Sequence, residues 1–150
     1  MNEILTDKES KIAFLLRYGQ MKERVEILIE RRKAYESDIY GIKSPVLSDM
    51  PKGTNIKTDL ADKVVKLLSQ TEDIDNELEA LRNKMNLVKE CIHRLKNYQY
   101  LSVLELKYID GMLRKQIADI MGISLQSLDK RTEKAIKYLP ITKEDLEKIL

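Results

Sequence analysis

Apolar side chains recur along the first two thirds of the chain at steps that alternate between three and four residues. A first run contains one charged member and consists of Phe14, Tyr18, Met21, Val25, Leu28, Arg32, Tyr35 and Ile39. A second run contains one polar member and consists of Val64, Leu67, Thr71, Ile74, Leu78, Leu81, Met85, Val88, Ile92 and Leu95. Repeats of this length are typical of long helices that pack along a narrow seam. We therefore predict two long helical arms.

The stretch between the two runs, Gly41 to Thr54, contains two prolines and two glycines. This composition predicts a loop, which we place at about residues 40–57. Thr58 or Asp59 can then cap the second arm, which would extend from about residue 58 to 96. The arms could fold back as an antiparallel hairpin or pair between chains. Because narrow seams bury little apolar surface, we expect a homo-oligomer. Alternatively, the arms could provide a docking surface for RNA polymerase or another phage protein.

A different pattern follows the arms and predicts two short helices joined by a tight turn. Ala118 provides the small side chain that lets two helices approach closely. Gly122 suits a turn with positive φ, and Ser124 can cap the next helix with its hydroxyl. The expected apolar wedge consists of Ile117, Met121, Ile123 and Leu128. The expected buried face of the second helix consists of Leu128, Thr132, Ala135, Ile136 and Leu139, before Pro140. This pattern indicates a helix-turn-helix, whose second helix usually enters the major groove of DNA.

Several residues on the second helix of this motif are candidates for contact with bases. Gln126 is the best candidate, because its amide can pair with an adenine edge through two hydrogen bonds. Ser127 is a weaker candidate, and Leu125 could touch a thymine methyl group. Asp129 would weaken DNA binding unless it accepts a hydrogen bond from a cytosine amine.

Basic residues around the same motif suit phosphate contacts, which orient a protein on DNA without reading its sequence. These residues are Arg114, Lys115, Lys130, Arg131 and Lys134. With Ser124 at the start of the second helix, they complete the predicted DNA-binding set. The alternative is a three-helix domain with a solvated charged face that binds no DNA. Helical spacing alone would allow that alternative, but the combined Ala, Gly and Ser positions favour the DNA-binding interpretation.

The stretch from Leu104 to Leu139 resembles region four of bacterial sigma factors. The resemblance rests on Leu104 with Tyr108, Asp110-Gly111, Ile117-Ala118, Gly122-Ile123-Ser124, and Arg131 with Ala135 and Leu139. Leu113 and Thr132 depart from it, since sigma factors favour a Ser or Thr cap and a Leu there. With a bulky apolar residue at position 113, the chain resembles the small phage regulators of the ArpU and RinA type. That resemblance implies a regulator of late genes in phages and prophages, with a helical N-terminal part and possible contact with RNA polymerase.

Composition narrows the class further. The 150 residues are 43% hydrophobic and 35% charged, with a net charge of +2, so a folded core is expected and indiscriminate nucleic-acid binding is not. Cys91 is the only cysteine and His93 the only histidine, which predicts no disulfide, no metal site and no cofactor. We interpret both as structural residues. No signal peptide or membrane span is apparent, which favours a cytoplasmic protein.

The end of the chain predicts one more short helix. Thr142 and Asp145 form a motif like a capping box, with Asp in place of Glu or Gln. We expect a helix from about residue 143 to 150, with Leu146, Ile149 and Leu150 packing on the core or on a partner.

Together these patterns predict an all-α protein. A coiled-coil helical hairpin would occupy residues 1–97, and a helix-turn-helix domain with a short terminal helix would occupy residues 98–150. The expected function is sequence-specific binding of double-stranded DNA by a transcriptional regulator of the phage late-gene type. The alternatives are a DNA-packaging subunit like a small terminase, and a protein adaptor that contacts RNA polymerase without binding DNA. An enzyme is not expected, because no nucleophile–base pair, phosphate-binding glycine loop or carboxylate pair in a recognisable motif is present.

Overall fold

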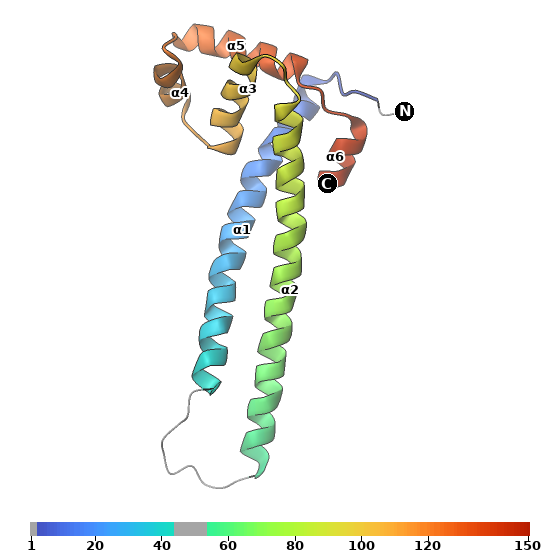
Figure 1. Ribbon diagram of the computed structural model, residues 1–150, viewed down its shortest axis with the longest axis vertical. Coiled ribbons are helices and arrows are strands. Elements are labelled where there is room, and N and C mark those ends of the chain that lie inside the picture. The colour runs from blue at the N-terminus through green and yellow to red at the C-terminus, as the bar shows by residue number, and fades with distance from the viewer. Residues whose placement is uncertain (1–2, 44–53) are drawn as a thin grey trace. The chain divides into compact units, whose positions relative to one another are not determined.

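The computed structural model describes the backbone of residues 3–43 and 54–150, and over these ranges the chain is all-helical (Figure 1). The elements are α1 (Lys8–Lys43), α2 (Thr54–His93), α3 (Tyr98–Leu104), the π-helical turn η1 (Glu105–Ile109), α4 (Arg114–Met121), α5 (Leu125–Tyr138) and α6 (Lys143–Ile149). The described residues contain no strand, and Ile4 and Thr142 form one isolated antiparallel bridge. The predicted all-α class and its long N-terminal helix pair are confirmed.

The two long helices extend further into the predicted loop than expected. α1 continues to Lys43 and α2 begins at Thr54, so the predicted boundaries at residues 40 and 57 were wrong. Thr58 and Asp59 lie inside α2, which excludes either as its cap, and α2 ends at His93 rather than near residue 96. A single glycine near a helix end costs only about 1 kcal/mol, so Gly41 did not end α1. The rest of the predicted loop, residues 44–53, lies outside the described residues.

The chain divides into two compact units, and the second comprises residues Arg24–Leu81. In this unit α1 and α2 run in opposite directions around a small core of Leu28, Ile74 and Leu78 (Figure 1). Two ion pairs cross the seam, from Arg24 to Glu77 at 2.9 Å and from Arg32 to Asp75 at 2.6 Å. The ion pair of Arg32 explains how a charged residue occupies a heptad position.

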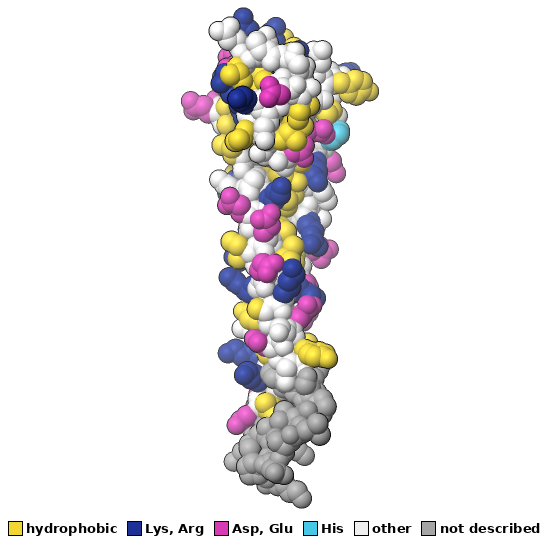
Figure 2. All heavy atoms as spheres, turned by 90° about the vertical axis from the view of Figure 1, so that its left-hand side faces the viewer, with side chains coloured by type: hydrophobic (Ala, Val, Ile, Leu, Met, Phe, Trp, Pro, Cys, Tyr) yellow, Lys and Arg dark blue, Asp and Glu magenta, His cyan; other side chains and the backbone are white. Residues whose placement is uncertain are grey.

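The face of the helix pair in Figure 2 carries interspersed basic and acidic side chains, as expected for the solvated face of an amphipathic helix. Every heptad residue predicted for the two arms is buried or half-buried, which confirms the predicted seam. Among the described residues, no helix is long and apolar enough to cross a membrane.

The first compact unit comprises Met1–Glu23 and Arg82–Leu150. Its core contains the predicted seam residues Phe14, Val88 and Ile92, which are fully buried. Leu15 is also fully buried, although it lies outside the heptad pattern. Cys91 is buried as predicted, and burial raises the pKa of its thiol to about 12, so the thiol stays protonated at neutral pH.

The predicted terminal helix is present as α6, and a network at its start connects it to the end of α2. The Thr142 hydroxyl accepts a hydrogen bond from the Asp145 N–H at 3.1 Å, and an Asp145 oxygen accepts one from the Thr142 N–H at 3.0 Å. Arg94 donates to the same carboxylate at 2.7 Å. Ile149 is buried and Leu146 half-buried as expected, but Leu150 is 69% exposed, so it does not pack on the core, and its packing on a partner stays a prediction. Leu150 follows Ile149, the last residue of α6.

Candidate nucleic-acid interface

Residues 122–124 form the tight turn between α4 and α5. Gly122 has φ of +65°, in the left-handed region that favours glycine. The Ile123 N–H donates to the Ala118 carbonyl at 3.1 Å and so closes the end of α4. The Ser124 hydroxyl accepts from the Ser127 N–H at 3.1 Å and caps α5. The predicted structural roles of Gly122 and Ser124 are confirmed.

A compact apolar cluster joins the two helices of this turn to α3. Its buried members are Val103, Ile117, Ala118 and Leu128, with Leu106, Met112, Met121 and Ile123 packed against them. The predicted wedge is therefore confirmed, and Ala118 is buried within it. Farther along α5, Ala135, Ile136 and Leu139 are buried and Thr132 is half-buried, as the spacing predicted. This cluster positions α5 so that its opposite face stays exposed.

The entry into α4 combines a π-helical turn, which the sequence did not indicate, with an apolar cap residue, which the sequence already showed as a departure from the sigma-factor pattern. η1 is followed by Gly111, which has φ of +67° and redirects the chain. The cap residue of α4 is Leu113, which has no polar side chain to offer. Instead, the Gln116 side chain accepts a hydrogen bond from the Leu113 N–H at 3.1 Å. This half of a capping box compensates in part for the absent Ser or Thr.

The outward face of α5 carries the main candidates for DNA contact. Gln126 is exposed at the second position of the helix, near its N-terminal end. Lys130 and Lys134 are exposed one and two turns further along, and neither makes an ion pair with another described residue. Leu125 is 39% exposed, and Ser127 is exposed with its hydroxyl 3.0 Å from that of Ser124.

The remaining basic candidates lie on α4 and on the flank of α5. Lys115 is exposed at the second position of α4. Arg131 is half-buried on the flank of α5 that meets α3 and α4, where it lines a depression with Gln99 and Ile120. Its position makes it a less accessible phosphate contact than Lys130 or Lys134.

Arg114 and Asp129, which were predicted to act separately, pair with each other. The Arg114 Nε donates to one Asp129 oxygen at 2.7 Å, and its Nη2 donates to the other at 2.5 Å. Hydrogen bonding to Arg114 lowers the pKa of Asp129, and the same hydrogen bonds raise the pKa of Arg114. Both side chains are 54% exposed, so the pair lies at the surface. Each Asp129 oxygen therefore already accepts one hydrogen bond from the guanidinium, and the contact of Asp129 with a cytosine amine stays a prediction.

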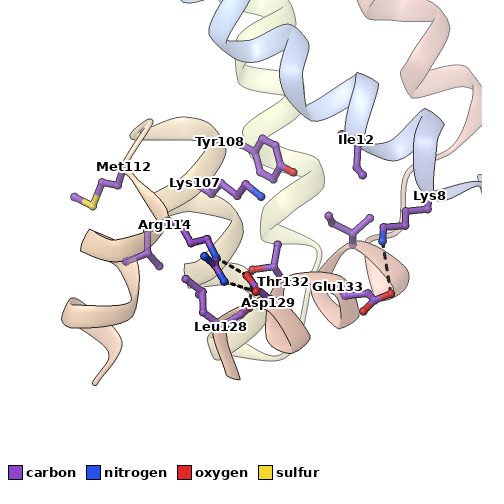
Figure 3. A pocket seen from close by; sticks show the side chains of 12 residues that line it. Lys8, Ile12, Lys107, Tyr108, Met112, Arg114, Leu128, Asp129, Thr132 and Glu133 are labelled. Carbon is purple, nitrogen blue, oxygen red and sulfur yellow. Dashed lines mark hydrogen bonds and ion pairs between the residues drawn. The ribbon is translucent and has the colours of Figure 1, made fainter. Parts of the chain in front are cut away.

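A groove of about 350 Å³ lies beside this pair, between the start of α1, η1 and the helices α4 and α5 (Figure 3). Ile12, Met112 and Leu128 contribute apolar side chains to its lining. Lys8 and Glu133 form an ion pair at 3.5 Å on one side of it. The Arg114–Asp129 pair lies at another side, so two ion pairs to α5 border the groove (Figure 3).

Lys11 contributes an additional contact to α5 that the sequence did not indicate. Its side chain is buried, and its ammonium group donates to the carbonyls of Ile136 and Lys137. The only sequence signal would have been a lysine one turn before Phe14 in an apolar stretch, which is a weak one.

Among the described residues, no group of three or more His, Cys, Asp or Glu side chains could hold a metal ion. His93 contacts Glu105 instead, with 2.6 Å between Nε2 and Oε1.

The described geometry defines a class of all-helical proteins in which a long helix pair accompanies two short helices that present a lysine-bearing face. The chain belongs to the family DUF1492, described as a protein of unknown function, which it matches over residues 42–140. The matched span contains α4, the turn and α5, and therefore the whole candidate interface. No curated protein and no solved structure was found to be similar to the chain.

Proposed function

We propose that this protein is a sequence-specific DNA-binding transcriptional regulator, and that α4, the turn and α5 act as a helix-turn-helix. The observation that carries the proposal is the pair of helices joined at Gly122, with α5 held by a buried apolar face and its polar face exposed. This arrangement is the one required of a helix that enters the major groove.

The exposed residues of α5 suit a division between reading and anchoring. Gln126 lies in the first turn of α5, from which recognition helices reach base edges, and its amide can pair with adenine. Lys130 and Lys134 are positioned for phosphate contacts. Ser127 is a weaker reader than Gln126, because its hydroxyl lies within hydrogen-bonding distance of Ser124 at the helix cap.

The charge distribution supports local rather than general attraction to DNA. The net charge of the chain is only +2, so binding has to rely on the few lysines of the α5 face. Phosphate contacts from so few cations give a moderate salt dependence, and base contacts then contribute a large share of the specificity.

A more specific proposal is a phage-type late-gene activator that works in the cytoplasm as a homo-oligomer and touches RNA polymerase. It is supported by the resemblance of residues 104–139 to sigma region four. The oligomer is supported by exposed apolar side chains on the helix pair, with Ile27 52%, Val65 65% and Leu68 47% exposed. In a dimer, the helix pair would set the spacing between two recognition helices and therefore between two DNA half-sites.

A protein adaptor that contacts RNA polymerase without DNA is the second candidate, and one observation favours it. Leu113 at the cap of α4 is 69% exposed and Ile120 on α4 is 61% exposed, which is more typical of a protein contact than of a phosphate-facing helix.

Selection from a random duplex library tests the proposal. The purified full-length chain is incubated with the library at near-physiological salt, and the retained duplexes are sequenced. A recovered motif, particularly an inverted repeat, is the expected result.

A Lys130→Ala, Lys134→Ala double variant with an unchanged circular dichroism spectrum is the matched control and should retain far less DNA. Retention without a motif would contradict a specific regulator and favour architectural or packaging roles. No retention at low salt would contradict DNA binding and favour the adaptor.

A further inference from the structure

The ion pair between α4 and α5 leaves one edge of a guanidinium group available. Arg114 uses Nε and Nη2 to contact the two oxygens of Asp129. A guanidinium carries five N–H donors, so the two on Nη1 and the second on Nη2 remain outside this pair. One N–H of Nη1 and the second N–H of Nη2 form the second edge of the planar group, and such an edge matches two oxygens of one phosphate.

The pair also lies where a DNA backbone would pass if the proposed function is correct. Arg114 is the first residue of α4, where backbone N–H groups lack helical partners and the helix dipole is positive. Lys115 follows it and is exposed. In helix-turn-helix proteins the first helix of the motif crosses the phosphate backbone. Asp129 lies on the flank of the outward face of α5, one residue before Lys130.

We propose that Asp129 is a positioning residue, which orients Arg114 so that its second edge binds a DNA phosphate, and therefore strengthens DNA binding despite its negative charge. This inference rests on the proposed function. A free arginine side chain loses rotational freedom when it binds, whereas a side chain already held at both Nε and Nη2 loses less. The exposed pair thus acts as a preorganised phosphate clamp.

Simple electrostatics predicts the opposite effect, which makes the inference testable. If Asp129 only neutralised Arg114 and repelled phosphate, its removal would tighten binding to every duplex. If Asp129 positions Arg114, its removal weakens binding, although the protein becomes more positive. Glu133 supplies a matched control, because it is an exposed carboxylate one turn further along α5 that pairs with Lys8 rather than with Arg114. Its removal should leave binding equal or tighter.

The experiment is a double-mutant cycle on the full-length chain with a duplex that the wild-type protein retains. Arg114→Ala should weaken binding by about five- to tenfold near 0.1 M salt, as expected for one lost phosphate contact. Asp129→Ala should weaken it by a similar factor, and the double variant should be no weaker than Arg114→Ala alone. Both single variants should lower the slope of log K against log salt by about one unit. Arg114→Lys should also bind more weakly and should lose its dependence on Asp129, because an ammonium cannot form the two-edged contact.

Two results would overturn the inference. Asp129→Ala binding as tightly as wild type or tighter, like Glu133→Ala, would show that the carboxylate only neutralises charge. Multiplicative losses in the double variant would show that the two residues act independently. Thermal unfolding of each variant checks for a folding defect. We expect unchanged melting temperatures, because both side chains are exposed. Failure of the wild-type chain to bind any duplex at low salt would instead refute the proposed function itself.

Discussion

The ammonium group of Lys11, near the start of α1, lies 2.9 Å from the carbonyl oxygen of Lys137 at the end of α5. A second hydrogen bond reaches the Ile136 carbonyl at 3.2 Å. Carbonyls in the last turn of a helix lack helical partners and carry the negative end of its dipole, so a cation there stabilises the end. Lys11 is only 4% exposed, and burial lowers its pKa. The first helix of the chain therefore holds the end of the proposed recognition helix.

Lys11→Ala should reduce the free energy of unfolding by about 1–3 kcal/mol, because the part-buried Lys137 carbonyl loses its ammonium donor and the Ile136 carbonyl keeps only the Leu139 N–H. Urea unfolding followed by circular dichroism measures this loss. Lys8→Ala is the control and should change little, since Lys8 is an exposed partner in a surface ion pair. Equal effects of the two substitutions would show that the buried contact contributes no special stability.

Two glycines should respond to alanine with opposite signs. Gly122→Ala should destabilise the fold by about 1–2 kcal/mol, because its φ of +65° is unfavourable for any residue with a Cβ atom. Gly19 lies inside α1 with open space around it, and Gly19→Ala should stabilise by up to about 1 kcal/mol through helix propensity. The melting temperature of each variant, compared with that of the wild-type chain, gives the sign of each effect. Stabilisation by Gly122→Ala would contradict the left-handed turn.

Asp145 should make the docking of α6 sensitive to acid. Burial alone would raise the pKa of Asp145, but hydrogen bonds from Arg94 and Thr142 outweigh burial and hold the pKa below its ordinary value of 3.8. Because the folded pKa is depressed, the stabilisation is fully present above 3.8 and is lost as the pH falls through the lower, folded pKa. The stability difference between wild type and Asp145→Asn should therefore shrink below about pH 4. A pH-independent difference between pH 7 and pH 2 would show that ionisation of Asp145 contributes nothing.

Substitutions of Gln126 and Lys130 on α5 should affect DNA binding differently. Gln126→Ala should relax base preference and reduce discrimination by about 1–3 kcal/mol, because it removes a base contact. Lys130→Ala should weaken all sequences about equally and reduce the salt slope by about one unit. Competition binding with matched and scrambled duplexes distinguishes the two effects. If neither variant changed binding, α5 would not be the reading helix.

Hydrophobic spacing was sufficient to predict most of the burial in this protein. The heptad residues of both arms are buried or half-buried, and Gly122 and Ser124 have the structural roles that their residue types predicted. These features were accessible because each depends on local periodicity or on the backbone preference of one residue. The limits of the arms were not accessible, because Gly41 is tolerated near a helix end when the surrounding residues favour helix.

The contacts between distant elements could not be predicted from a single sequence. Lys11 had the residue type of a solvated face, and only the fold places the end of α5 beside it. Arg114 and Asp129 are fifteen residues apart and meet because the turn at Gly122 brings α4 alongside α5. Both residues belong to the DNA-binding set that the sequence predicted, but periodicity contains no information about which charged side chains will pair.

A titration of the isotope-labelled full-length chain with a retained duplex of about 20 base pairs tests the central claim most directly, because NMR reports the contacted surface. We expect the largest amide shift changes at Gln126, Ser127, Lys130 and Lys134, with smaller ones at the start of α4. Shift changes confined to the helix pair of Arg24–Leu81, or no shift changes at low salt, would contradict the claim that α5 binds DNA.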